Sequence, residues 1–138
     1  MKYSSQLARA TERILHKSPA MGKLRVLIVE DNSDVRRLYA IGLNQHGFEV
    51  KLAANGAEAV ERIQEEQPDV IVLDWLMPLM DGGEVLSRVS TDGIPIIVIS
   101  GQPALADDAR DPRIVSWLTK PVTIEELVEQ IQRPVAVR

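Results

Sequence analysis

The sequence predicts an α/β domain with a doubly wound, five-stranded parallel sheet. Five short apolar runs recur along the chain, at residues 24–29, 48–53, 70–73, 95–99 and 114–118. Segments with helical spacing of apolar residues separate most of them. The run Val70-Ile71-Val72-Leu73 has no polar position, as expected of a central parallel strand that is covered on both faces. Strands that alternate with helical crossovers favour a parallel sheet with helices on both sides.

The helices are expected in the intervals between and after these runs. The first follows capping residues in the segment 30–33 and ends at Gly47, with an apolar stripe on Val35, Leu38, Tyr39, Gly42 and Leu43. The second is expected over 55–66, the third over about 82–90, and the last after Thr123. Residues 101–113 contain two prolines and several acidic residues. The fourth helix in chain order, which would lie there, is therefore predicted to be reduced or irregular.

The length of 138 residues suits one domain, and 45% hydrophobic residues allow a sizeable core. We expect an N-terminal extension over residues 1–22, the domain over 23–134 and a short tail over 135–138. The extension carries four basic residues and one acidic residue, and an apolar stripe at helical spacing. A helix that docks on the domain, a helix that pairs with another chain, the remnant of a linker from an upstream module and a frayed tail all remain open for it.

Charge and composition narrow the function classes. Twenty acidic and sixteen basic residues give a net charge of −4, which argues against nucleic-acid binding, so we expect no direct DNA binding. The chain has no cysteine, which excludes disulfides and thiolate metal sites. It has no apolar run of membrane-spanning length and no signal-peptide segment. We therefore expect a cytoplasmic protein without membrane contact.

Polar residues follow four of the predicted strands at the points where they end. Glu30 and Asp31 follow the first strand, Asp74 the third, Ser100 the fourth and Lys120 the fifth. In such sheets ligands bind at the carboxyl ends of the strands, so we expect these side chains to converge.

Three gathered carboxylates repel one another unless a cation is bound. Mg²⁺ suits them because it takes carboxylate ligands and keeps several waters. A metal and an ammonium group can stabilise a transferring phosphoryl group, which makes Asp74 a candidate carboxylate nucleophile that forms an acyl phosphate. The cluster thus indicates magnesium-dependent phosphoryl transfer.

At this point the sequence resembles a known family, the receiver domain of two-component response regulators. The matching residues are Glu30-Asp31, the run from Val72 to Gly82, Ile99-Ser100-Gly101 and Thr119-Lys120-Pro121. Each piece alone is common, but all of them in order, each after its own strand, are specific. The resemblance covers about residues 23–131 and implies the flavodoxin-like fold of the chemotaxis regulators.

The resemblance implies roles for five site residues. Asp74 would accept a phosphoryl group from a phosphohistidine on a histidine kinase or a histidine phosphotransfer protein. Mg²⁺ would be held by Asp74, by Asp31 directly, by Glu30 through water and by the backbone carbonyl of Leu76. Lys120 would pair with the phosphoryl group.

The resemblance also implies an output element. Ser100 would move toward the phosphoryl group, past the small Gly101, and the switch aromatic would be Trp117, where the family usually has Tyr or Phe. Pro121 would follow a cis peptide bond that aims the preceding lysine into the site. A change in this element would alter binding to a downstream protein target, and homodimer formation is left open.

Two other functions compete with a phosphoacceptor module that has at most weak autophosphatase activity and is otherwise not an enzyme. One is a pseudo-receiver that acts only as an interaction scaffold. Such a protein would lack some of the site residues, but all five are present in this sequence. The other is a metal-dependent phosphohydrolase with an aspartyl nucleophile. Such enzymes place a general acid two residues after the nucleophile, where Leu76 cannot serve.

Overall fold

A computed structural model describes residues 22–91, 93–103 and 111–132, and it confirms the expected fold. Five strands form one parallel sheet in the order β2-β1-β3-β4-β5. Their bounds are β1 (Arg25–Val29), β2 (Glu49–Ala53), β3 (Val70–Asp74), β4 (Ile96–Ser100) and β5 (Ile114–Thr119). The order reverses at β1 and β3, and that reversal is the point at which doubly wound sheets bind ligands.

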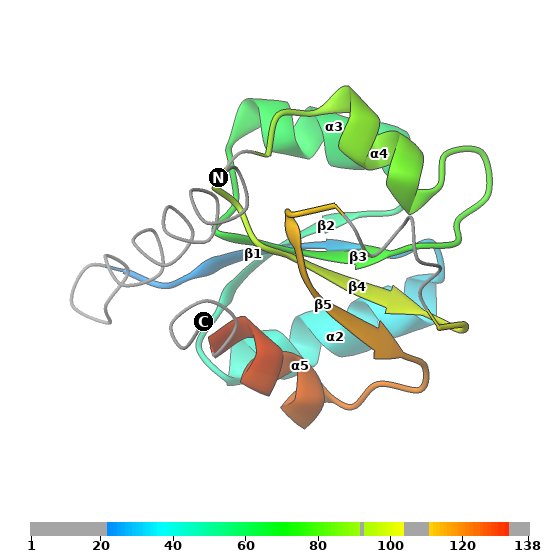
Figure 1. Cartoon of the computed structure of the whole chain (residues 1–138). Coiled ribbons are helices and arrows are strands. Elements are labelled where there is room, and N and C mark those ends of the chain that lie inside the picture. Colours follow the sequence, from blue (N-terminus) through cyan, green and yellow to red (C-terminus); the bar gives the residue numbers. More distant parts are fainter. Residues whose placement is uncertain (1–21, 92, 104–110, 133–138) are drawn as a thin grey trace.

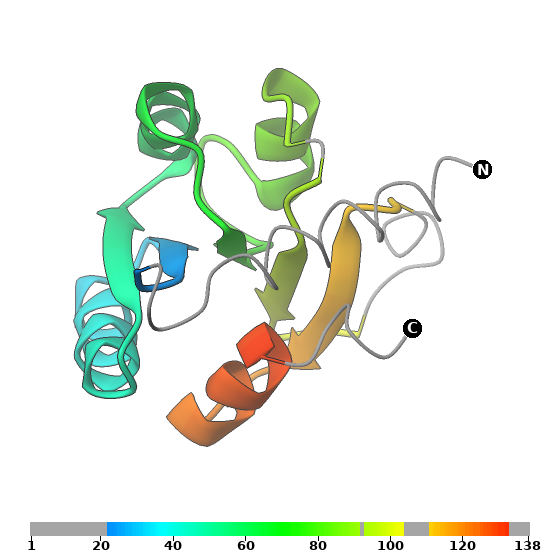
Figure 2. The ribbon, with the colours of Figure 1, turned by 90° about the vertical axis from the view of Figure 1, so that its left-hand side faces the viewer.

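Helices cover both faces of the sheet (Figure 1, Figure 2). One face carries α2 (Ser33–Gln45) and α5 (Ile124–Gln132), and the other carries α3 (Gly56–Glu65) and α4 (Gly82–Arg88). Each face of the sheet has its own hydrophobic core, and alternate strand residues point into one or the other. Val26 and Ile28 pack with α2 and α5, whereas Leu27 and Val29 pack with α3 and α4. Because β1, β3 and β4 are buried on both faces, their carboxyl ends are held rigidly.

Helix caps lie directly beyond the strands and determine where the connecting loops turn. Asn32 Oδ1 accepts hydrogen bonds from the backbone of Asp34 and Val35, both at 3.0 Å, and begins α2 three residues after β1 ends. Asp81 Oδ1 accepts from Glu84 N at 3.0 Å and begins α4. Each cap ends a short loop at the same edge of the sheet.

The predicted apolar stripe of the first helix is wrong at one position. Leu38 is 61% exposed, while Tyr39, Gly42 and Leu43 form the buried face of α2. Gly42 lies directly against the side chain of Ile124, so α2 and α5 meet closely at this glycine.

The described part of the chain contains four helices, and none lies between β4 and β5. Residues 104–110, within the segment where the reduced fourth helix was expected, lie outside the described residues, as does nearly all of the N-terminal extension. The domain limits of 23 and 134 therefore stay predictions. Among the described residues no helix is long and apolar enough to span a bilayer.

Candidate functional site

Three carboxyl groups meet at the carboxyl edge of the sheet. Glu30 and Asp31 follow β1 and Asp74 ends β3, and one carboxylate oxygen from each lies within 4.8 Å of the others. We call these residues the acidic trio. Glu30 and Asp74 are 2% and 4% exposed, whereas Asp31 is exposed. The structure thus brings together the three carboxylates that were predicted from the sequence to bind a metal.

Lys120 reaches the acidic trio from the end of β5, which β4 separates from β3. Its Nζ lies 3.6 Å from Glu30 Oε1 and 3.6 Å from Asp74 Oδ1. Its backbone N–H donates to the carbonyl of Ser100 at 2.8 Å, which ties the loop after β5 to the end of β4. The peptide bond between Lys120 and Pro121 is cis, as the resemblance implied.

The trio holds more negative charge than Lys120 balances. The pKa of Asp74 is raised to about 7, first by burial, then by the charge of Glu30 and a hydrogen bond with Asp31, and Lys120 lowers it only in part. The pKa of the buried Tyr39 is also raised, by burial and then by Glu30 and Asp74. A compact set of carboxylate oxygens that is short of positive charge fits a hard divalent cation such as Mg²⁺.

Ser100 and Trp117 are connected through the backbone of Gln102, a link that the sequence analysis did not predict. The buried Ser100 Oγ accepts a hydrogen bond from Gln102 N at 3.2 Å. The carbonyl of Gln102 accepts one from Trp117 Nε1 at 3.1 Å. A Cβ on Gly101 would meet nothing within 4 Å, so the space beside Ser100 is open.

The indole of Trp117 also packs against Trp75, the residue after Asp74. The two ring centroids are 5.1 Å apart and the rings are tilted by 55°. Trp75 in turn covers the start of α4, where a Cβ on Gly82 would overlap the indole. Trp117 is therefore held from two sides, by the loop after β4 and by the loop after β3.

The rest of the loop after β3 presents apolar side chains to solvent. Leu76 is 57% exposed and Leu79 is 99% exposed, with Leu79 at a backbone φ of 74° that leucine rarely adopts. The predicted role of the Leu76 carbonyl as a metal ligand stays a prediction.

Arg36 is a further residue near the site that the sequence analysis missed. Its Nη1 donates to the backbone carbonyl of Glu30 at 2.9 Å and to that of Asp31 at 3.4 Å. The available signal was a cation near the start of a helix, where the helix dipole disfavours positive charge.

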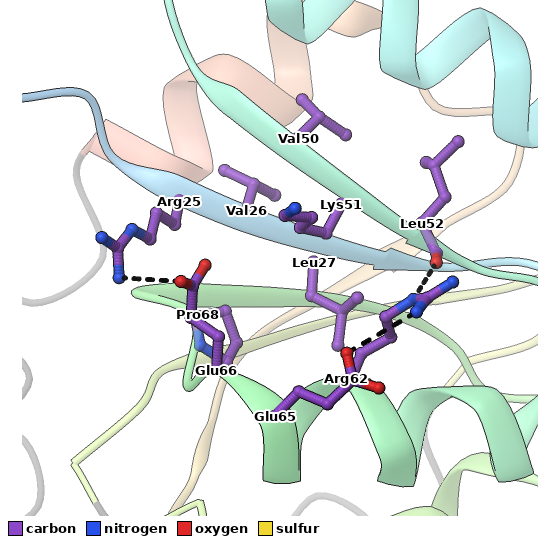
Figure 3. Close-up of a pocket in the computed structure, with 10 residues that line it drawn as sticks. All are labelled: Arg25, Val26, Leu27, Val50, Lys51, Leu52, Arg62, Glu65, Glu66 and Pro68. Carbon is purple, nitrogen blue, oxygen red and sulfur yellow. Dashed lines mark hydrogen bonds and ion pairs between the residues drawn. The ribbon is translucent and has the colours of Figure 1, made fainter.

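A surface hollow of about 590 Å³ lies elsewhere, between the end of α3, the first residues of β1 and the middle of β2 (Figure 3). Two of the three cations that line it, Arg25 and Arg62, already have partners. Arg25 lies 3.5 Å from Glu49 and 3.8 Å from Glu66, and Arg62 Nε donates to the Leu52 carbonyl at 3.2 Å. The hollow does not include the acidic trio, so it is not the place of any chemistry at Asp74.

Known proteins similar to this chain include two mycobacterial regulators and one solved structure. The transcriptional regulatory protein PrrA of Mycobacterium tuberculosis is 38% identical over 112 residues, 78% of this chain and 48% of PrrA. The response regulator MprA of Mycobacterium leprae is 34% identical over 113 residues, 79% of this chain and 50% of MprA. The chemotaxis protein CheY4 of Vibrio cholerae superposes with a TM-score of 0.74 at 29% identity, covering 82% of this chain and 99% of that structure.

These relatives correct one expectation about partners. The prediction of no direct DNA binding is wrong as an exclusion, because PrrA is a transcriptional regulatory protein. The chain spans about half the length of the curated relatives it matches. The exclusion rested on the net charge of these 138 residues, and that charge says nothing about the other half of such a protein.

The family match covers the described fold almost end to end. Residues 26–132 match the response regulator receiver domain, from the second residue of β1 to the last residue of α5. The strand order and the acidic trio at the switch point agree with that match. The chain therefore belongs to the response regulator receiver domain family, the signalling modules of two-component systems.

Proposed function

We propose that this protein is switched by Mg²⁺-dependent transfer of a phosphoryl group from a phosphohistidine to Asp74. The observation that carries the proposal is the grouping of the acidic trio within 4.8 Å, with Lys120 Nζ at 3.6 Å from the Asp74 carboxylate. The donor would be a histidine kinase or a histidine phosphotransfer protein, as the family membership suggests. A cytoplasmic location belongs to the same proposal.

Glu30, Asp31, Asp74 and the backbone carbonyl of Leu76 would hold the cation. When bound, Mg²⁺ supplies positive charge that favours the ionised Asp74 and polarises the transferring phosphoryl group. The raised pKa of Asp74 supports this, since a carboxylate that is half protonated at neutral pH is a poor nucleophile.

In the transfer, an oxygen of the ionised Asp74 forms a bond to phosphorus while the bond from phosphorus to the donor imidazole nitrogen breaks. The imidazole leaves with the electron pair of that bond and takes a proton from solvent. Lys120 would bind an oxygen of the phosphoryl group, and Ser100 would donate a hydrogen bond to another. The product is an acyl phosphate on Asp74.

Autophosphatase activity is proposed to be weak. Leu76, 57% exposed and two residues after Asp74, carries no group that can orient or deprotonate a water molecule. The same residue argues against an aspartyl phosphohydrolase, which would need a general acid there. The complete set of charged site residues argues against a scaffold without phosphoryl chemistry.

The test replaces the nucleophile and keeps its shape. Asp74→Asn should abolish labelling by radioactive acetyl phosphate or by a phosphorylated histidine kinase, because an amide oxygen cannot form the acyl phosphate. Asp81→Asn is the matched control: it lies in the same loop, and asparagine keeps the cap of α4, so labelling should be unchanged. Undiminished labelling of Asp74→Asn would contradict the assignment.

The output would begin with Ser100, and the backbone of Gln102 would pass it on. If Ser100 turns to the phosphoryl group, Gln102 N–H loses its acceptor while Trp117 stays held by Trp75. We therefore expect beryllofluoride, a phosphoryl mimic, to change hydrogen exchange mainly across residues 101–113 and little in α3. Indifferent amides at 101–113, together with a changed exposure of Trp117, would instead indicate a moving aromatic.

A further inference from the structure

We propose that Arg36 is a positioning residue of the magnesium site, because it holds the backbone that carries Glu30 and Asp31. The inference rests on the proposed function and concerns how strongly the acidic trio binds the cation. The hydrogen bonds of Arg36 go to main-chain oxygens of the two residues, not to their carboxylates.

One guanidinium nitrogen holds two consecutive carbonyls. Arg36 Nη1 lies 2.9 Å from Glu30 O and 3.4 Å from Asp31 O, so it spans the turn between β1 and α2. The side chain of Glu30 has restraints of its own: Oε2 accepts from Asn32 N at 3.1 Å, and Oε1 lies 3.6 Å from Lys120 Nζ. Asp31 is the exposed member of the trio and its side chain is hydrogen-bonded to Asp74, so its direction also depends on the backbone that Arg36 holds.

The placement of Arg36 also has a local electrostatic cost. It is the fourth residue of α2, near the amino end, where a positive charge opposes the helix dipole. Arg36 is unfavourable for the helix dipole, yet it binds the backbone of two predicted metal ligands. Its position is therefore better explained by a role at the site than by a contribution to α2. Groups that orient metal ligands from behind commonly change metal affinity about 10-fold to 100-fold when they are replaced.

The next residue supplies a matched control. Arg37 carries the same charge one position along the helix, is exposed, and makes no hydrogen bond or ion pair in the described part of the chain. Removing either arginine makes the region more negative and alone would favour cation binding slightly. A loss of affinity that occurs only at position 36 therefore reports positioning rather than charge.

The experiment compares Arg36→Gln, Arg36→Lys and Arg37→Gln in the full chain. Mg²⁺ is titrated by tryptophan fluorescence, because Trp75 adjoins the site, and by the rise in melting temperature that the cation produces. We expect affinity to fall about tenfold in Arg36→Gln and to stay within about twofold in Arg37→Gln. Arg36→Lys keeps the charge, but its ammonium nitrogen lies one bond nearer the backbone than Nη1 of arginine, so it should not reach both carbonyls and should lose affinity too.

A second readout separates positioning from a general loss of structure. At saturating Mg²⁺, Asp74 labelling in Arg36→Gln should return to the wild-type level, and its melting temperature in EDTA should match that of Arg37→Gln. Equal Mg²⁺ affinities for the two glutamine variants would overturn the inference, and Arg36→Lys still tests it if Arg36→Gln does not fold. A wild-type protein that ignores Mg²⁺ would overturn the proposed function and this inference together, whereas a Mg²⁺ response with unaffected Arg36 variants would overturn this inference alone.

Discussion

Two groups of charged side chains lie at opposite ends of the sheet and differ in how well their charges are matched. At the carboxyl end, the acidic trio faces one ammonium group among the described residues, that of Lys120, and the pKa of Asp74 is raised to about 7. At the amino end of β5, Arg113 binds both oxygens of Asp111, at 3.0 and 2.8 Å. We call this second group, with the acceptors described below, the Arg113 clamp.

In the described part of the chain, each nitrogen of the Arg113 guanidinium group donates a hydrogen bond. Arg113 Nη1 donates to the carbonyl of Leu86 at 3.0 Å and to Thr91 Oγ1 at 3.1 Å, and so ties the end of α4 to the start of β5. The pKa of Asp111 is lowered: burial would raise it, but the hydrogen bonds and charge of Arg113 outweigh burial. The fold thus pairs charges where it needs stability and leaves them unbalanced where a cation and a phosphoryl group would complete them.

Disrupting the clamp should cause a larger loss of stability than any change in the acidic trio. Arg113→Gln leaves buried acceptors at Leu86 and Thr91 without their donor, and it leaves Asp111 unpaired, so we expect a loss of about 3 kcal/mol in unfolding free energy. Urea denaturation measures it. Arg88→Gln is the control, because that arginine forms an exposed pair with Glu84 and its loss should cost under about 0.5 kcal/mol. Equal losses in the two variants would show that the clamp contributes no more than a surface pair.

The same contrast explains what could be predicted from sequence. The strands and the acidic trio were predictable because apolar runs of strand length place the residue that follows each run at one edge of a parallel sheet. The clamp, the Gln102 link and Arg36 were not, because each depends on distances between segments far apart or on backbone carbonyls that carry no sequence signature. The exposure of Leu38 was not predicted either, because helical spacing alone does not show how far the covered face of α2 extends.

Removing a carboxylate from the acidic trio should raise the stability of the protein, whereas disrupting the Arg113 clamp lowers it. Asp31→Ala removes one member of a repelling set, so without metal the protein should gain about 1 kcal/mol, the scale of a like-charge contact near water. The same variant should lose its Mg²⁺ response and its Mg²⁺-dependent labelling. Asp34→Ala removes an exposed acid from the first turn of α2 and should do neither. Thermal melts in EDTA and in Mg²⁺ would decide, and a destabilised Asp31→Ala in EDTA would contradict the picture of repulsion.

The smallest expected effect is a pH dependence of the unfolding free energy that comes from the acidic trio. Because the folded-state pKa of Asp74 is about 7, the folded protein keeps a proton that the unfolded chain releases near about pH 3.9. The folded state therefore binds more protons in this range, and stability falls as pH rises through the folded pKa. Asp111 has the opposite sign: its pKa is lowered, so its contribution is lost only as pH falls below about 3.9. Near neutral pH only Asp74 of the two should act.

Urea denaturation in EDTA should therefore show unfolding free energy falling by about 0.8 kcal/mol between about pH 6.5 and 8. Asp74→Asn has no carboxylate at this position, so its profile supplies the baseline from all other titrating groups and should lack this fall. Saturating Mg²⁺ should flatten the wild-type profile as well, since the cation favours the ionised carboxylate at both pH values. Parallel wild-type and Asp74→Asn profiles would mean that Asp74 is already ionised without a cation, and the contrast between the two ends of the sheet would then lose its electrostatic basis.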